Sequence, residues 1–306
     1  MAAKTEIRCV TVFGGSGFLG NKIVKCLAAE GVDVRVAVRR PDSARIGKSP
    51  HQTGNIKHVY ADVRDETSVA LAVDGCDAAV NSVGLYVEQG AETFESVHEL
   101  GALNVAHQCV AHKVKRLIQI SGIGADLHSR SSYVRARAKG ELLAKDVFPK
   151  TTILRPSVLF GPRDKFINTL AKIIRYSPVV PLFGTGDTKL QPVYVDDVAL
   201  ATRQALQNTQ SQGMTYELGG LRAYAYAELI ELVLAQAGKR RLLIPLPFIV
   251  WEGLAIFGSL LPSSPLTRDQ VLLMKEDNVV AQNALSLNDL DVSATALEDV
   301  LPKYTF

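Results

Sequence analysis

Hydrophobic residues follow two patterns along the chain: short unbroken runs, and longer stretches in which they recur every three or four positions. The short runs, beginning with Val10–Phe13, predict parallel strands that are buried on both faces. The longer stretches, such as the one containing Ile23, Val24 and Leu27, predict amphipathic helices. Five strand–helix alternations follow one another without a linker rich in proline or glycine. We therefore expect an α/β fold built on one doubly wound parallel sheet.

The predicted elements cover most of the chain. Strands are expected at Val10–Phe13, Val34–Val38, Ile56–Tyr60, Asp77–Asn81, Lys115–Ser121, Thr151–Leu154 and Met214–Leu218. Helices are expected after Gly20, at Thr67–Val73, at Glu92–His112, from Ser132, at Val195–Gln207, at Tyr224–Ala237 and at Phe248–Leu261. Capping residues mark three helix starts: Asp65 or Thr67, Asp196 or Asp197, and the pair Thr267 and Gln270, which has capping-box spacing.

A glycine-rich turn joins the first strand to the first helix. Glycines at these positions allow a tight turn and let backbone N–H groups approach a diphosphate without interference from a Cβ atom. The helix that follows points its N-terminal amides and the positive end of its dipole at that anion. The order strand, glycines, helix predicts a dinucleotide site, with a purely structural turn as the alternative. The predicted contacts are Gly14, Gly15, Ser16, Gly17, Phe18, Leu19 and Gly20.

Two arginines follow the second strand. In dinucleotide folds an acidic residue near this strand end binds the ribose 2′-hydroxyl of NAD, whereas arginine suits the 2′-phosphate of NADP. Arg39 and Arg40 occupy the position here, so we expect NADP(H) to be preferred over NAD(H). A solvated basic loop is the alternative interpretation.

Further cofactor contacts are expected where later strands end. Asp62, with Val63, follows the third strand and is placed to bond the adenine amino group, while Asp65 or Thr67 nearby is suited to cap the next helix. Small residues after the fourth strand suit a backbone that passes close beneath a cofactor. The remaining predicted contacts are Ser82, Val83, Gly84, Ser121, Tyr133, Arg137, Pro156, Ser157 and Val158.

The length of 306 residues and the apolar content of 47% suffice for one large α/β unit and a smaller annex. We expect residues 1–155 to form a Rossmann-type NADP(H)-binding domain whose sheet is completed by about 188–218. Residues 156–187 and 219–306 are expected to form the smaller, mainly helical C-terminal region, which meets a substrate or partner.

Composition excludes several classes of function. The net charge of +3 and the lack of a basic run argue against a nucleic-acid surface. The four cysteines, Cys9, Cys26, Cys76 and Cys109, stand apart in apolar contexts and are interpreted as buried free thiols of a reducing compartment. The six histidines lack metal-ligand spacing, so no metal is expected. Neither a targeting peptide nor a transmembrane helix is recognised, and the expected location is cytoplasmic.

Ordered motifs along the chain resemble those of the extended and atypical short-chain dehydrogenases/reductases. They include G-G-S-G-F-L-G, D-V-R-D, N-S-V-G, I-S-G-I-G-A, L-R-P-S-V-L-F-G-P and V-D-D-V-A-L-A. The segments P-L-F-G-T-G-D-T-K-L-Q-P-V-Y-V-D-D-V-A, Y-E-L-G-G and P-L-T-R-D-Q-V-L-L-M-K-E-D-N-V-V are similar to the branch formed by the accessory subunit of respiratory complex I and its bacterial relatives. This resemblance runs from about Thr11 to Leu301.

The resemblance also implies a catalytic set, and the chain departs from it. Chemistry of this kind uses a tyrosine acid/base, a cation that eases its deprotonation, and a hydroxyl that polarises a carbonyl. Tyr133, Arg137 and Ser121 are placed for these roles, but the family pattern has lysine where Arg137 stands. Gly122 replaces a second serine, and His98 stands at an asparagine position of the pattern. Arginine keeps the charge without the compact bonding of an ammonium group, so efficient hydride transfer is not expected.

Three functions remain open at this stage. The leading hypothesis is an accessory or assembly subunit of complex I with NADP(H) as a structural ligand. An active NADP(H)-dependent reductase or a nucleotide-sugar epimerase/dehydratase is the alternative, and a redox-sensing NADP(H)-binding regulator is the third. The nearly uniformly apolar helix at Phe248–Leu261, with Glu252 and Ser259 as its polar stripe, suggests that the C-terminal helices dock complex I subunits or the cytoplasmic face of the inner membrane.

Overall fold

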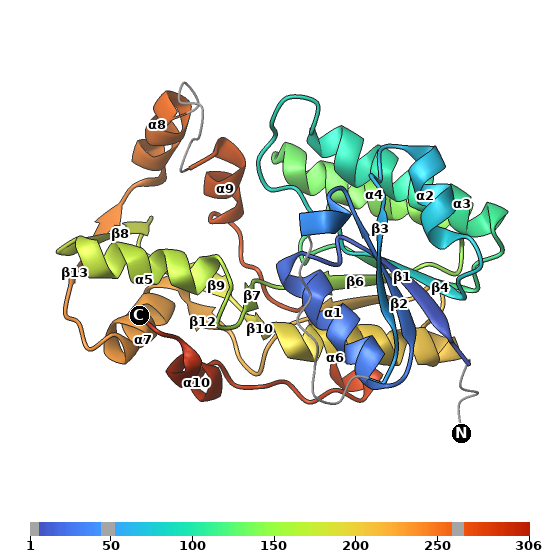
Figure 1. The fold of residues 1–306 in the computed structure, drawn as a ribbon. Coiled ribbons are helices and arrows are strands. Elements are labelled where there is room, and N and C mark those ends of the chain that lie inside the picture. Colours follow the sequence, from blue (N-terminus) through green and yellow to red (C-terminus); the bar gives the residue numbers. More distant parts are fainter. Residues whose placement is uncertain (1–5, 44–52, 259–265) are drawn as a thin grey trace.

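The computed structural model describes residues 6–43, 53–258 and 266–306 of the chain. Its centre is a seven-stranded parallel sheet with the order β11-β6-β5-β4-β1-β2-β3 (Figure 1). The strands are β1 (Cys9–Phe13), β2 (Asp33–Val38), β3 (Ile56–Tyr60), β4 (Ala78–Asn81), β5 (Arg116–Ile120), β6 (Thr152–Pro156) and β11 (Thr215–Leu218). All seven coincide with predicted strands to within two residues at each end. The doubly wound α/β fold is therefore confirmed.

Helices cover both faces of this sheet (Figure 1). One face is covered by α1 (Phe18–Ala29) and α6 (Val195–Gln207), whose apolar residues join those of the strands in one core. The other face is covered by α2 (Glu66–Val73), α3 (Gly101–Ala111) and α4 (Ser132–Val147), around a second core. Strand order reverses at β1, which pairs with β2 on one side and β4 on the other. In open α/β sheets, ligands bind at the carboxyl ends of the strands beside such a reversal.

A second, mainly helical part lies beside the carboxyl ends of the strands (Figure 1). Its helices are α5 (Phe166–Tyr176), α7 (Tyr226–Gln236), α8 (Phe248–Gly258), α9 (Arg268–Leu273) and α10 (Leu297–Val300). Short strands pair here as β7 (Leu159–Phe160) with β10 (Val193–Tyr194), β8 (Val179–Phe183) with β13 (Leu242–Leu246), and β9 (Lys189–Leu190) with β12 (Tyr224–Ala225). Side chains from α5, α7 and α10 meet in a separate apolar core.

Several helix ends behave as the capping residues predict. Asp65 accepts a hydrogen bond from the Thr67 amide at the start of α2, and Thr267 with Gln270 forms the full capping box of α9. The prediction for α6 is wrong. Its N-cap is Tyr194, and both aspartates lie inside the first turn, where Asp196 pairs with Lys22 and Asp197 accepts hydrogen bonds from Thr295.

The helix predicted at Glu92–His112 begins later than expected. Glu92 forms an antiparallel bridge with Gln89, and this pairing keeps it out of helical geometry. The helix starts with a π-helical segment, η2 (Glu95–Leu100), and continues as α3. The helix predicted at Tyr224–Ala237 likewise loses its first two residues to β12. Of the helix predicted at Phe248–Leu261, residues 259–261 lie outside the described part.

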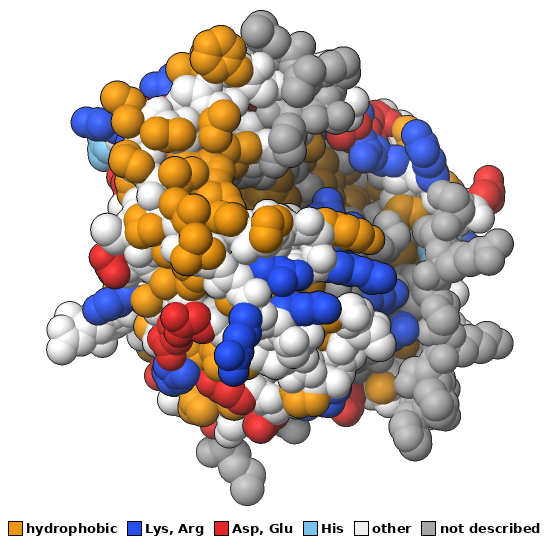
Figure 2. Space-filling view, turned by 90° about the vertical axis from the view of Figure 1, so that its left-hand side faces the viewer, with side chains coloured by type: hydrophobic (Ala, Val, Ile, Leu, Met, Phe, Trp, Pro, Cys, Tyr) orange, Lys and Arg blue, Asp and Glu red, His pale blue; other side chains and the backbone are white. Residues whose placement is uncertain are grey.

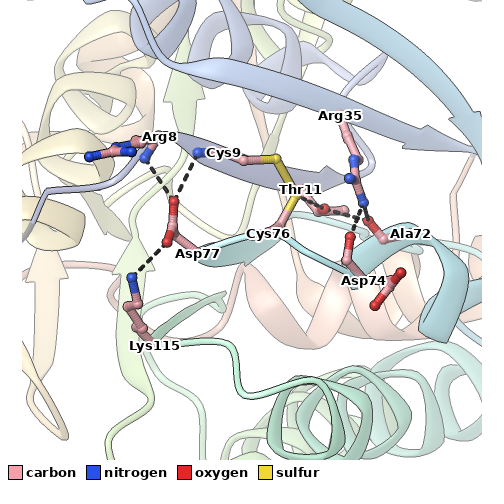
Figure 3. The surroundings of a disulfide bond; sticks show 9 residues. All are labelled: Arg8, Cys9, Thr11, Arg35, Ala72, Asp74, Cys76, Asp77 and Lys115. Atoms are coloured by element: carbon pink, nitrogen blue, oxygen red, sulfur yellow. Dashed lines mark hydrogen bonds and ion pairs between the residues drawn. A yellow bond between two sulfur atoms is a disulfide. The ribbon is translucent and has the colours of Figure 1, made fainter.

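The prediction of four free cysteines also needs correction. Cys9 opens β1 and Cys76 precedes β4, and the two form a disulfide with a Cα–Cα distance of 4.8 Å (Figure 3). Adjacent parallel strands bring them together, because Val10 lies opposite Ala78 in the register. A separation of 67 residues gives no hint of this pairing. The expectation of free thiols holds for Cys26 and Cys109 and is wrong for Cys9 and Cys76.

Candidate functional site

One large cavity, of about 1570 Å³, connects the two parts of the molecule. One half of its wall comes from the turn after β1 and from the ends of β2, β4 and β5. The other half comes from α5, β8, α8 and α9. The cavity therefore begins at the strand-order reversal beside β1, where the fold predicts a ligand.

The glycine turn approaches its neighbours too closely for side chains. Gly14 has a φ of +72°, and a Cβ atom there would lie 3.0 Å from the backbone of Ser82. A Cβ atom on Gly20 would lie 2.2 Å from the Gly14 carbonyl oxygen, so α1 begins directly against the turn. Gly17 is the N-cap of α1 and offers no side chain, and the first turn of the helix contains no acidic residue. The N-terminal amides of α1 are thus left for an anion.

The predicted residues of this turn divide into two groups. Gly14, Ser16, Gly17, Phe18 and Leu19 line the cavity. Gly15 and Gly20 are not part of its wall. A Cβ atom on Gly15 would lie 2.9 Å from Val36, so this glycine, like Gly20, serves close packing of turn and helix.

The end of β2 carries paired charges. Arg39 lines the cavity and forms an ion pair with Glu92, while Arg40 is not in the wall. On the neighbouring strand end, Asp62 accepts hydrogen bonds from the guanidinium of Arg64, which holds the pKa of Asp62 below its ordinary value. Two cations and two carboxylates therefore share this corner of the cavity.

The residues that follow β4 belong to the cavity wall. Ser82, Val83 and Gly84 all line it, and a side chain at Gly84 would meet no atom within 4 Å. The Ser82 hydroxyl donates to the Phe13 carbonyl oxygen at 2.6 Å and so ties the end of β4 to the end of β1. On the far side of the cavity lie Pro156, Ser157 and Val158. The Ser157 hydroxyl donates to Asn278, a wall residue that is not among the predicted contacts.

Tyr133 lies in an aromatic enclosure at the centre of the cavity. The ring centroids of Tyr86, Phe94 and His98 each lie 5.5 Å from that of Tyr133. Phe94 and His98 also contact each other, at 6.3 Å. The side chain is buried, with 5% of its surface exposed. Burial raises the pKa of Tyr133 well above its ordinary value, and the Arg137 cation only partly opposes this shift. The phenol is therefore held in its protonated form.

Arg137 binds Tyr133 directly and uses space that Gly122 leaves open. The Arg137 guanidinium donates to the Tyr133 hydroxyl oxygen at 2.5 Å, one helical turn away on α4. A Cβ atom on Gly122 would lie 2.6 Å from Nη1 of Arg137 and 2.9 Å from its Cζ. The two departures from the family pattern therefore depend on each other, because the guanidinium of Arg137 occupies the space that a side chain at position 122 would need.

His98, the third departure, faces the same tyrosine. Its Nε2 lies 2.9 Å from the Leu85 carbonyl oxygen. Burial, together with the positive charge of Arg137, lowers the pKa of His98 from 6.5 to about 4. The imidazole is therefore neutral at physiological pH and adds no second cation beside Arg137.

Ser121 meets the structural requirement for a ligand-binding hydroxyl. It lines the cavity at the end of β5 and is 2% exposed. Within the described part of the chain, its hydroxyl has no hydrogen-bond partner. A buried polar group without a partner is costly, so a ligand atom that bonds it is favoured.

The second half of the cavity is more apolar than any motif in the sequence indicates. It is walled mainly by Phe166, Leu170, Ile173, Val180, Pro181, Phe183, Trp251, Leu254, Leu272 and Leu273. These residues come from four elements that are distant in sequence, and periodicity alone assigns them to ordinary helix faces. No described helix is long and apolar enough to cross a membrane.

Comparison with known proteins agrees with this architecture. The NAD dependent epimerase/dehydratase family matches residues 10–219. The mitochondrial NADH dehydrogenase [ubiquinone] 1 alpha subcomplex subunit 9 of Arabidopsis thaliana is 33% identical, over 92% of this chain and 73% of that protein. Its namesake from Rattus norvegicus is 31% identical, over 94% of this chain and 77% of that protein.

Solved structures show the same fold at lower identity. The UDP-glucose 4-epimerase of Thermotoga maritima, solved with UDP-glucose, superposes with a TM-score of 0.73 at 18% identity and covers 96% of each chain. The chain therefore belongs to the NAD-dependent epimerase/dehydratase family, among the extended short-chain dehydrogenases/reductases, and is related to alpha subcomplex subunit 9 of NADH dehydrogenase.

Proposed function

We propose that this protein is an accessory subunit of respiratory complex I that binds NADP(H) as a structural ligand. The partnership is supported by the complex I relatives, which align over more than nine-tenths of this chain. The structural role of the nucleotide is supported by Tyr133, whose phenol is buried, bonded to Arg137 and raised in pKa. A general acid/base works best with a pKa near the operating pH, and this tyrosine is far from that condition.

The residues present fit a dinucleotide. Gly14 and Gly17 carry no side chains that would cover the N-terminus of α1, whose first amides have no side-chain cap and suit the diphosphate. Ser121 offers an unpartnered hydroxyl to the cofactor or to a ligand beside it. The nicotinamide of such a cofactor would supply hydride-transfer chemistry. Whether that chemistry is used depends on the deprotonation of Tyr133, which its burial opposes.

Preference for NADP(H) follows from the charges at the end of β2. Arg39 lies on the cavity wall with its side chain half exposed. It occupies the position at which NAD-specific folds place an acidic residue. A 2′-phosphate would compete with Glu92 for this guanidinium, and it carries more charge than a carboxylate. Arg64 stands on the adjacent strand end with Asp62 as its partner.

The contact surface for complex I is proposed to be the exposed face of α8 and its neighbours. Ile249 and Phe257 on α8 are 76% and 73% exposed, and Leu242 on β13 continues the apolar surface. Figure 2 shows hydrophobic side chains gathered in a band on this side of the molecule. Lys172 and Arg175 of α5 are exposed beside it. An apolar band beside basic residues suits a partner at an anionic membrane surface.

Mass spectrometry of the nucleotide released from purified protein tests the cofactor. We expect NADP(H), and we expect Arg39→Ala to weaken NADP(H) binding at least tenfold while leaving NAD(H) binding unchanged. Arg175→Ala, which removes an exposed arginine outside the cavity wall, is the matched control. Release of NAD(H) alone would overturn the proposed preference.

Copurification from native membranes tests the partner. Ile249→Glu and Phe257→Glu should each reduce recovery of complex I subunits with the tagged protein. Leu71→Glu changes an equally exposed leucine on α2, away from α8, and should leave recovery unchanged. Wild-type protein that recovers no complex I subunit would refute the assignment.

An active reductase or epimerase is the second candidate, favoured by one observation. Ser121, Tyr133 and a cation line the same cavity, so the three chemical roles of the family are present. Steady NADPH oxidation that Tyr133→Phe abolishes would establish this activity in place of a structural role.

A further inference from the structure

The cavity as a whole is larger than a typical ligand pocket. Typical ligand pockets measure about 300–1,000 Å³, whereas the whole cavity here is about 1570 Å³. Beyond Tyr133 the side chains that α5, β8, α8 and α9 contribute to its wall are mostly aliphatic and aromatic, with Thr169 and Gln270 as the polar exceptions. The indole nitrogen of Trp251 is already bonded to the Leu182 carbonyl oxygen at 2.9 Å, and the ring stacks on Phe183. Trp251 therefore presents hydrocarbon to the cavity.

Ser121, Tyr133 and Arg137 supply neighbouring polar groups to the cavity wall. Arg137 bonds the Tyr133 hydroxyl and packs against Gly122, the residue after Ser121. The Ser121 hydroxyl is buried and has no partner among the described residues, so it lacks the hydrogen bond that a buried hydroxyl needs. A ligand that suits both these polar groups and the apolar wall has one small polar group and a long apolar remainder.

The apolar half of the cavity reaches the exposed apolar face of α8. Leu254 of α8 and Ile173 of α5 both line the cavity and are exposed, at 51% and 37%. The hydrophobic band in Figure 2 lies on the same side of the molecule. The apolar wall is thus continuous with the outer surface that we propose contacts complex I.

We propose that this half of the cavity binds a single hydrocarbon chain whose carbonyl or hydroxyl head group lies at Ser121 and Tyr133. The chain enters between α5 and α8, past Ile173 and Leu254. A nucleoside diphosphate sugar, the polar alternative, would leave most of this wall in contact with hydroxyl groups and water. This inference rests on the proposed function in one respect: it assumes that the nucleotide occupies the half of the cavity beside the glycine turn.

A series of 2-alkanones from 2-hexanone to 2-dodecanone tests the inference on the full-length protein with its nucleotide bound. Trp251 is the single tryptophan of the chain and lies in the wall, so its fluorescence reports binding directly. Each added methylene should tighten binding about fourfold until the apolar half is filled, the value expected from about 0.8 kcal/mol per buried methylene. Affinity that does not depend on chain length, or displacement of 2-dodecanone by UDP-glucose, would overturn the proposal.

Matched variants on α8 locate the site. Leu254→Glu places a carboxylate at the mouth and should weaken 2-dodecanone binding at least tenfold. Ile249→Glu changes another exposed aliphatic residue of the same helix, outside the cavity wall, and should leave it unchanged. If Leu254→Glu fails to fold, Ile173→Glu approaches the mouth from α5. Equal effects of the variants at 249 and 254 would count against the site.

Nucleotide content is measured in the same samples, which separates the two proposals. Protein that retains NADP(H) but shows no chain-length dependence would refute the hydrocarbon site alone. Protein that binds 2-dodecanone but releases no nucleotide would refute the proposed cofactor alone.

Discussion

At the scale of single residues, the departures from the family pattern are coupled. Gly122, Arg137 and His98 all surround Tyr133, and each changes the space or charge available to the others. An arginine in place of the family's lysine needs more room, and the glycine at the end of β5 provides it. The result is a protonated, tightly held tyrosine in a family whose chemistry needs one that ionises.

A double-mutant cycle measures the coupling between Gly122 and Arg137. Gly122→Ser should displace the guanidinium from Tyr133 and lower the free energy of unfolding by about 1–3 kcal/mol. In an Arg137→Lys background the same change should cost less, because the crowded Nη1 and Nη2 atoms are gone. We expect an interaction free energy of about 1 kcal/mol from urea denaturation. Additive effects would show that the two positions are independent.

His98 gives the protein a pH dependence of known sign. Its pKa is about 4 in the folded state and 6.5 as the ordinary value, so between these values the unfolded chain binds a proton that the folded protein does not. Above pH 6.5 both states are neutral and this residue has no effect. Lowering the pH from 7.5 to 5 should therefore remove about 2 kcal/mol of stability through His98.

The measurement compares denaturant unfolding of the wild type and His98→Asn at both pH values. The variant should lose about 2 kcal/mol less than the wild type over this range, and other titrating groups cancel in the difference. Parallel losses in the two proteins would mean that His98 is protonated in the folded state.

At the scale of secondary-structure elements, the same substitution should have opposite effects at two helical glycines. A Cβ atom on Gly20 of α1 meets the Gly14 backbone at 2.2 Å, whereas one on Gly253 of α8 meets nothing within 4 Å. Gly20→Ala should cost about 1–3 kcal/mol and weaken nucleotide binding. Gly253→Ala should add up to about 1 kcal/mol, because alanine favours a helix. Thermal unfolding and nucleotide content of the two variants test both signs.

The elements themselves were largely predictable from sequence, and the reason is local. The seven strands of the main sheet are apolar runs between turn residues, so periodicity suffices to locate them. The predictions fail where a distant residue decides. Asp197 bonds Thr295, Glu92 pairs with Arg39, and Cys9 meets Cys76 across neighbouring strands. The apolar cavity was missed for the same cause, because α5, α8 and α9 only form a wall once folded together.

At the scale of the whole molecule, the position of the cavity predicts that a bound nucleotide stabilises both parts at once. The predicted nucleotide contacts include Ser157, which bonds Asn278, and Val158, which packs on the core of the second part, so a nucleotide bound at the sheet also contacts residues held by that part. A ligand that binds only the folded state stabilises it by RT ln(1 + [L]/Kd), about 2.7 kcal/mol at 100 times Kd. For a chain of this size that corresponds to a rise in Tm of about 5 °C.

Protein stripped of nucleotide should therefore melt in a single transition that rises with added NADPH, and less with NADH at equal concentration. The difference between the two nucleotides should disappear in Arg39→Ala, because Arg39 is the cavity cation proposed to meet the 2′-phosphate. A transition that NADPH leaves unchanged would contradict a structural role for the nucleotide. The other contrary result is two separate transitions, with NADPH raising the Tm of only one of them. The nucleotide would then stabilise one part alone, and the cavity would not couple the two parts.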